Sequence, residues 1–129
     1  MSRLRVLSLS TLFPSPTRPA FGKFVANQMQ AVTARGDVDL VVVNLYPFAA
    51  TVAKGADRDE ITENIDIGGP AMIRSAAKNF RFVGVVVNPV RYDQVLAEMT
   101  QQGEITDQTR MALAREAYSH TAAYDSCIT

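Results

Sequence analysis

The chain has 129 residues, of which 47% are hydrophobic and 20% are charged, which is typical of one folded domain and excludes a disordered chain. Thirteen basic residues balance thirteen acidic ones, so charge gives no support for a nucleic-acid or anionic-membrane partner. One cysteine excludes an internal disulfide, and one histidine leaves too few ligands for a zinc site. No apolar stretch approaches the ~20 residues of a membrane-spanning helix, so we expect a cytoplasmic protein.

The first third of the chain predicts a strand, a helix and a second strand. Residues 4–9 (LRVLSL) form a short apolar run that is typical of a buried strand; a signal peptide is the less favoured alternative. Three prolines within residues 14–19 indicate a stiff loop, and apolar spacing predicts a helix over residues 21–34. The valine-rich run at 38–43 predicts a strand that is buried on both faces. The three elements predict a right-handed βαβ unit.

The same alternation continues further along the chain. Residues 57–63 are polar with helical tendency, and residues 66–70 (DIGGP) indicate a tight turn. Pro70 suits the first position of a helix that continues to about Lys78. Residues 82–87 (FVGVVV) predict a third buried strand, adjacent and parallel to the strand around 41–43.

Two further helices are predicted at 89–99 and 106–118, where apolar residues recur at helical spacing. Alternating strands and helices predict an α/β fold with three layers and a mainly parallel sheet. We expect one α/β domain over residues 1–129, with a sheet that is narrow for a chain of this length.

Three segments resemble one family when taken in order. NLYPF at 44–48 follows the second strand, NIDIGGP at 64–70 leads into RSAAKN at 74–79, and HTAAYD at 120–125 closes a helix. Over about residues 38–129 the chain resembles the cyclohydrolase domain of the bifunctional AICAR transformylase/IMP cyclohydrolase family. The resemblance implies a methylglyoxal-synthase-like, Rossmann-like parallel α/β fold.

The first 37 residues resemble a different family. Their strand, proline-rich loop and GKFV helix start are similar to the opening of a GT-B-type glycosyltransferase. The domain would then consist of a glycosyltransferase-like βα segment at 1–37 and a partial cyclohydrolase domain at 38–129. A glycosyltransferase N-terminal fragment is therefore one alternative function, although one Rossmann-like unit cannot hold a sugar nucleotide across a cleft.

The cyclohydrolase resemblance implies a role in purine biosynthesis, the ring closure of FAICAR to IMP. A carboxamide nitrogen attacks a formyl carbon in the same molecule and water leaves, so the protein must orient groups, move protons and stabilise an oxyanion. This chemistry needs no cofactor, and folate would belong to the transformylase half. The expected partner is a small-molecule purine nucleotide, and a homodimer is left open.

The resemblance assigns catalytic roles to Lys78, Asp66 and Tyr46, each of which has a structural alternative. Lys78 would donate or accept a proton, or else interact with the negative end of its helix. Asp66 would orient the amide or assist proton transfer, or else accept hydrogen bonds in a turn or N-cap. Tyr46 would donate to the oxyanion, or else pack beside Pro47. We expect the three catalytic side chains to converge at one end of the sheet.

The remaining candidate residues would bind substrate. By the same resemblance, Asn44 and Leu45 line the base pocket. Ile67, Gly68 and Gly69 place backbone NH groups at a helix start, where an anion or a carbonyl oxygen is favoured. His120 has no nucleophile to pair with in the sequence, which favours a structural role.

Three family segments have no counterpart in the chain. In the family, a serine/lysine-containing loop, a Ser-Thr-Gly-Gly-Thr segment and a Lys-Thr-Leu-His-Pro segment hold the phosphate and supply a second catalytic lysine. We therefore expect an incomplete or hybrid chain with impaired activity. A non-catalytic domain that binds a nucleotide or a partner is the other alternative.

Overall fold

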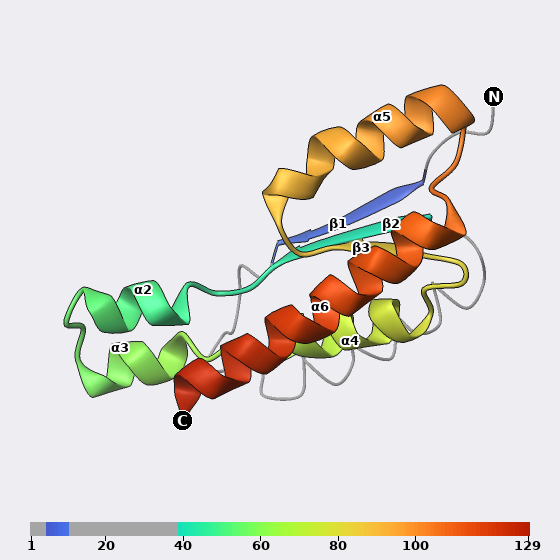
Figure 1. Ribbon diagram of the computed structural model, residues 1–129. Helices are drawn as coiled ribbons and strands as arrows, with labels where there is room; N and C mark the ends of the chain where they lie inside the picture. Colours follow the sequence, from blue (N-terminus) through green and yellow to red (C-terminus); the bar gives the residue numbers. More distant parts are fainter. Residues whose placement is uncertain (1–4, 11–38) are drawn as a thin grey trace.

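The computed structural model describes residues 5–10 and 39–129, which form a three-layer α/β arrangement (Figure 1). A three-stranded sheet lies in the middle, with helix α5 on one face and helices α4 and α6 on the other. This confirms the predicted fold class. Within these described residues, no helix combines the length and apolar character needed to cross a membrane.

The sheet is parallel, with strand order β1 (Val6–Ser10), β2 (Leu40–Asn44), β3 (Gly84–Val86). Val41 pairs with Leu7 on one side and with Val85 on the other, so β2 is the central strand of the described sheet. Its apolar run has no period-two alternation because both faces are covered by helices. The prediction that the valine-rich runs form adjacent, parallel, buried strands is confirmed.

Helices α4 (Gly68–Lys78) and α6 (Asp107–Ile128) cover one face of the sheet. Their contact surfaces use small residues, including Ala76 and Ala117, which are fully buried. Small side chains let the two helix backbones approach each other closely and place bulkier residues against the strands. The core on this face consists mainly of Val41, Val43, Met72, Ile73, Ala76, Ala77, Val83, Val85, Val87, Ala114 and Ala117.

The opposite face is covered by α5 (Tyr92–Gln102), which follows the short 3-10 helix η1 (Pro89–Arg91). Val95 of α5 is buried in a second core cluster with Leu40 and Val86 of the sheet. The helix ends at Gly103, whose φ of 77° is left-handed and therefore suits glycine.

Two short helices, α2 (Phe48–Ala53) and α3 (Arg58–Glu63), extend beyond the carboxyl end of β2 (Figure 1). Asp57 caps α3 by accepting a hydrogen bond from the Glu60 amide at 2.9 Å. Phe48 of α2 is buried and packs edge-on against Tyr124 near the end of α6. The two helices therefore connect β2 to the turn that precedes α4.

Several element boundaries differ from the sequence prediction. The third strand begins at Gly84 because Phe82 lies in a turn and is 68% exposed. Helix α6 continues to Ile128 instead of ending near residue 118, and α2 was not predicted. The predicted loop at 14–19 and helix at 21–34 lie outside the described residues.

The start of β1 is fastened to the start of β2 by a salt bridge. The Asp39 carboxylate accepts three hydrogen bonds from Arg5, one from its backbone NH at 3.0 Å and two from its guanidinium at 3.2 and 3.0 Å. These hydrogen bonds lower the pKa of Asp39 below its ordinary value, against the opposing effect of burial. The contact stabilises the pairing of β1 with β2.

The Asp39–Arg5 pair should make stability depend on pH. Because the pKa is lowered on folding, the stabilisation is present above the unfolded value of about 3.9 and is lost as pH falls through the folded value. Both side chains are partly exposed, so we expect less than about 1 kcal/mol. The difference in free energy of unfolding between wild type and Asp39→Asn should shrink between pH 7 and pH 3. Asp125→Asn, at an exposed position, is the control. If the difference for Asp39→Asn stays as constant between pH 7 and pH 3 as the difference for this control, the assignment is contradicted.

Candidate functional site

The candidate site lies where β2 ends. Asn44 is the last residue of the strand, and Leu45 and Tyr46 follow it before Pro47 and the start of α2. Leu45 and Tyr46 are half-buried, whereas Asn44 is exposed. In open parallel sheets, ligands bind beyond the carboxyl ends of the strands, so these residues occupy a typical binding position.

Asp66 joins this segment to the start of α4. Its carboxylate accepts a hydrogen bond from the Tyr46 amide at 3.1 Å and another from the Gly69 amide at 2.7 Å. Asp66 is only 5% exposed, so both interactions are shielded from water. The bond to the amide three residues later is the usual N-cap contact, even though the helix begins at Gly68. Its alternative role as a turn and cap acceptor is therefore present in the structure.

Gly69 fits this arrangement only because it has no side chain. A Cβ atom there would lie 2.5 Å from Leu45 Cδ2 and 2.6 and 2.8 Å from the two carboxylate oxygens of Asp66. These distances are too short for real contacts, so a side chain at this position would force Leu45 or the Asp66 carboxylate to move. Because the Gly69 NH donates to Asp66, it is already engaged, unlike the substrate-facing donor that the sequence suggested.

Ile67 and Gly68 remain the candidates for backbone donors at this end. The first NH groups of a helix have no intrahelical partner and favour an anion or a carbonyl oxygen. The Ile67 side chain is 73% exposed, beside the buried Asp66. The site thus combines exposed and half-buried residues after β2 with the first turn of α4.

Tyr124 completes the site from the far end of the chain, and the sequence analysis missed this role. Its hydroxyl accepts a hydrogen bond from the Asp66 NH at 2.8 Å and donates one to the Asn64 carbonyl oxygen at 3.1 Å. Burial raises the pKa of the Tyr124 hydroxyl, with nearby negative charges acting in the same direction, so the group stays protonated and can donate. In the sequence, only the HTAAYD segment, which contains Tyr124, pointed to this residue.

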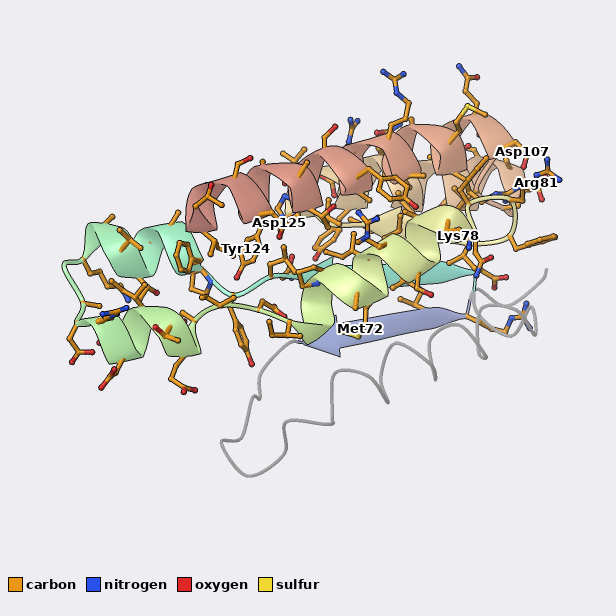
Figure 2. All side chains as sticks on the ribbon, turned by 90° about the horizontal axis from the view of Figure 1, so that it is seen from below. Met72, Lys78, Arg81, Asp107, Tyr124 and Asp125 are labelled. Carbon is orange, nitrogen blue, oxygen red and sulfur yellow. The ribbon has the colours of Figure 1, made fainter. Side chains whose placement is uncertain are left out.

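Lys78 does not join Tyr46 and Asp66, so the predicted convergence of the three is wrong. It is the last residue of α4, whereas Asp66 precedes the first, and the eleven residues of this helix span about 16 Å. Figure 2 shows Lys78 near Arg81 and Asp107, away from Tyr124 and Asp125. Lys78 is exposed at the helix C-terminus, where a positive charge is favoured.

Two further expectations concern His120 and metal binding. His120 is half-buried within α6. In the part of the chain that the structure describes, no group of three or more His, Cys, Asp or Glu residues is arranged to hold a metal ion. The polar groups at this end of the sheet include backbone amides, the Asp66 carboxylate and the Tyr124 hydroxyl.

Two family models match the chain. The model of the MGS-like domain matches residues 3–71, and the model of the AICARFT/IMPCHase bienzyme matches residues 76–129. The first match includes most of residues 1–37, so the resemblance of that segment to a glycosyltransferase finds no support. A short strand followed by a proline-rich loop begins several parallel α/β folds and does not distinguish between them.

Curated relatives share substantial identity with this chain. The bifunctional purine biosynthesis protein PurH of Sorangium cellulosum is 60% identical over 93 residues, which cover 71% of this chain and 18% of that protein. PurH of Desulfitobacterium hafniense strain DCB-2 is 48% identical over 123 residues, which cover 93% of this chain and 24% of that protein. The second alignment necessarily extends far into the first 37 residues. The chain spans about a quarter or less of the length of these relatives.

A solved structure supports the same relationship. The crystal structure of ForH aligns with a TM-score of 0.59 and 32% identity, covering 87% of this chain and 62% of that one. The family models, the curated relatives and the solved structure therefore indicate the same relationship. The chain belongs to the family of MGS-like domains and is of the type found in the bifunctional purine biosynthesis proteins PurH.

Proposed function

We propose that this chain carries the base-binding half of an IMP cyclohydrolase site, which acts in purine biosynthesis by closing the ring of FAICAR to give IMP. The observation that carries the proposal is the hydrogen bond between the Tyr46 amide and the Asp66 carboxylate. This bond brings together the NLYPF and DIGG segments, which are twenty residues apart in sequence. The names of the PurH relatives point in the same direction. The glycosyltransferase alternative is not favoured.

The proposed reaction asks little covalent chemistry of the protein. The carboxamide nitrogen forms a bond to the formyl carbon, and the formyl oxygen gains negative charge. The carboxamide and formamido nitrogens each give up one proton, and these two protons convert that oxygen into water as its bond to carbon breaks and a C=N bond forms. Donors that are already oriented toward the developing charge lower the barrier most. In this proposal the Tyr46 hydroxyl and the Ile67 and Gly68 amides are those donors, and Asn44 and Leu45 contact the base.

Asp66 has a positioning role in this proposal. Its two carboxylate oxygens already accept backbone amides, so it holds the donors in place instead of carrying a proton. Lys78 is assigned no role in this proposal, because it lies at the opposite end of α4 from Asp66. The proposed partner is a purine nucleotide and the proposed reaction uses no cofactor. A homodimer stays a prediction that sedimentation analysis can check.

Tyr46→Phe tests the proposal. We expect the purified chain to bind IMP and to convert FAICAR slowly, because the family's phosphate-holding segments have no counterpart in its sequence. Loss of the Tyr46 hydroxyl should lower kcat by at least tenfold, since an oxyanion donor contributes about 10²–10³ in favourable cases. Conversion is followed by absorbance and binding by calorimetry.

Tyr92→Phe is the matched control, because Tyr92 is an exposed tyrosine on α5. It should leave binding and kcat unchanged. A folded wild-type chain that neither binds IMP nor converts FAICAR would refute the proposed function. Equal rates for wild type and Tyr46→Phe would refute the role of Tyr46 alone.

A further inference from the structure

Tyr124 contacts two separate parts of the molecule, helix α2 and the turn that holds Asn64 and Asp66. It lies in the second-last turn of α6, and its ring packs edge-on against Phe48 of α2 with centroids 6.4 Å apart. Its hydroxyl accepts from the Asp66 NH and donates to the Asn64 carbonyl oxygen. A phenol hydroxyl can donate one hydrogen bond and also accept one. The Tyr124 hydroxyl does both, and both partners lie on the turn that contains Asn64 and Asp66.

The turn that Tyr124 holds is the one that carries the Asp66 carboxylate. Tyr124 fixes the peptide of Asp66 from one side, and the Asp66 side chain reaches the Tyr46 and Gly69 amides from the other. Rotation of the Asp66 backbone would move both oxygens away from those amides. A Cβ atom at Gly69 would lie 2.6 and 2.8 Å from the two carboxylate oxygens, so the carboxylate packs closely against the Gly69 backbone.

We infer that Tyr124 is a positioning residue of the site, which sets the orientation of Asp66 and thereby of the Tyr46 and Gly69 backbone. The end of α6 then controls the geometry at the end of β2. Tyr46 lies 78 positions before Tyr124 in the sequence. Tyr124 touches no reacting atom in this scheme. The inference rests on the proposed function only where affinity for IMP is measured.

Tyr124→Phe removes the hydroxyl and keeps the ring that packs on Phe48. Hydrogen exchange should speed up by at least tenfold at the Tyr46, Asp66 and Gly69 amides and by less than twofold at the amide of Val85 in β3. Affinity for IMP should fall at least fivefold. Tyr118→Phe is the matched control, because Tyr118 is an exposed tyrosine on the same helix and the ring that lies beneath Arg74 is kept.

Two results would overturn the inference. Exchange at Tyr46 and Gly69 that is as slow as in Tyr118→Phe would show that Tyr124 does not position them. Exchange that rises equally at Val85 would show a general stabilising role only. If wild type binds no IMP but Tyr124→Phe gives the expected exchange pattern, the proposed function fails and the positioning role stands.

A second variant covers the case in which Tyr124→Phe does not fold. Asp66→Asn keeps the backbone NH of residue 66, which donates a hydrogen bond to the Tyr124 hydroxyl. It weakens only the hydrogen bonds that the side chain accepts. It should speed exchange at the Tyr46 and Gly69 amides, while the Asp66 amide, still bonded to Tyr124, stays within twofold of wild type. Fast exchange at all three would show that Tyr124 does not hold the turn independently and would overturn the inference.

Discussion

Asp66→Ala should lower the free energy of unfolding by about 3–5 kcal/mol. The substitution removes two hydrogen bonds that a buried carboxylate accepts from the Tyr46 and Gly69 amides. Hydrogen bonds to charged groups contribute about 1.5–3 kcal/mol each, and loss of a helix cap alone costs about 0.5–2 kcal/mol. Both amides would also be left without this partner where water has little access. Urea unfolding followed by circular dichroism measures the change.

A graded series separates the charge from the geometry. Asp66→Asn keeps one acceptor oxygen and should cost less than Asp66→Ala. Asp125→Ala removes the same kind of side chain from an exposed position near the end of α6 and should change stability by less than about 0.5 kcal/mol. A loss below about 1 kcal/mol for Asp66→Ala would show that the carboxylate does not fasten β2 to α4.

Gly69→Ala should destabilise the protein by about 1–3 kcal/mol, although alanine normally favours a helix. Helix propensity alone predicts a gain of about 0.5–1 kcal/mol for replacing an interior glycine. The new Cβ would instead lie 2.5 Å from Leu45 Cδ2 and within 2.8 Å of both Asp66 oxygens. Leu45 can rotate away, but the carboxylate is held by two amides, so overpacking should prevail. The sign of the change in free energy of unfolding therefore decides between the two effects.

A double-mutant cycle identifies what Gly69→Ala collides with. In the Asp66→Ala background the carboxylate is absent, so adding Gly69→Ala should cost at least about 1 kcal/mol less than in wild type. In the Leu45→Ala background only the closest contact is removed, so most of the cost should remain. A stabilising effect of Gly69→Ala in wild type would contradict the crowding at this position.

The sheet was predictable because its signal is local and strong. Valine-rich runs at Val41–Val43 and Val85–Val87 have no alternation, which indicates burial on both faces and hence a parallel sheet covered by helices. The length of α6 was not predicted, because the polar stretch after Tyr118 weakens the apolar pattern although the helix continues. Its far end is instead supported by tertiary contacts, including buried Thr121 and the Tyr124–Phe48 pair.

The site was predictable in part. Tyr46 and Asp66 follow a strand and precede a helix at the same edge of the sheet, so their proximity follows from parallel topology. The predicted convergence of Lys78 with Asp66 was wrong. The helix predicted between Pro70 and Lys78 already implied that the two residues are separated. The structure places Lys78 at the end of α4 that lies farther from Asp66.

The sequence by itself determined the alternation of strands and helices, the buried parallel strands and the two motifs that meet at the site. These depend on the periodicity and turn chemistry of neighbouring residues, which act over a few positions. Only the tertiary structure decided that the Asp66 oxygens are taken up by amides, that Gly69 has no room for a methyl group, and that Tyr124 holds the turn. Those contacts join residues up to 60 positions apart, and their geometry is set by how α6 packs across α4 and β3.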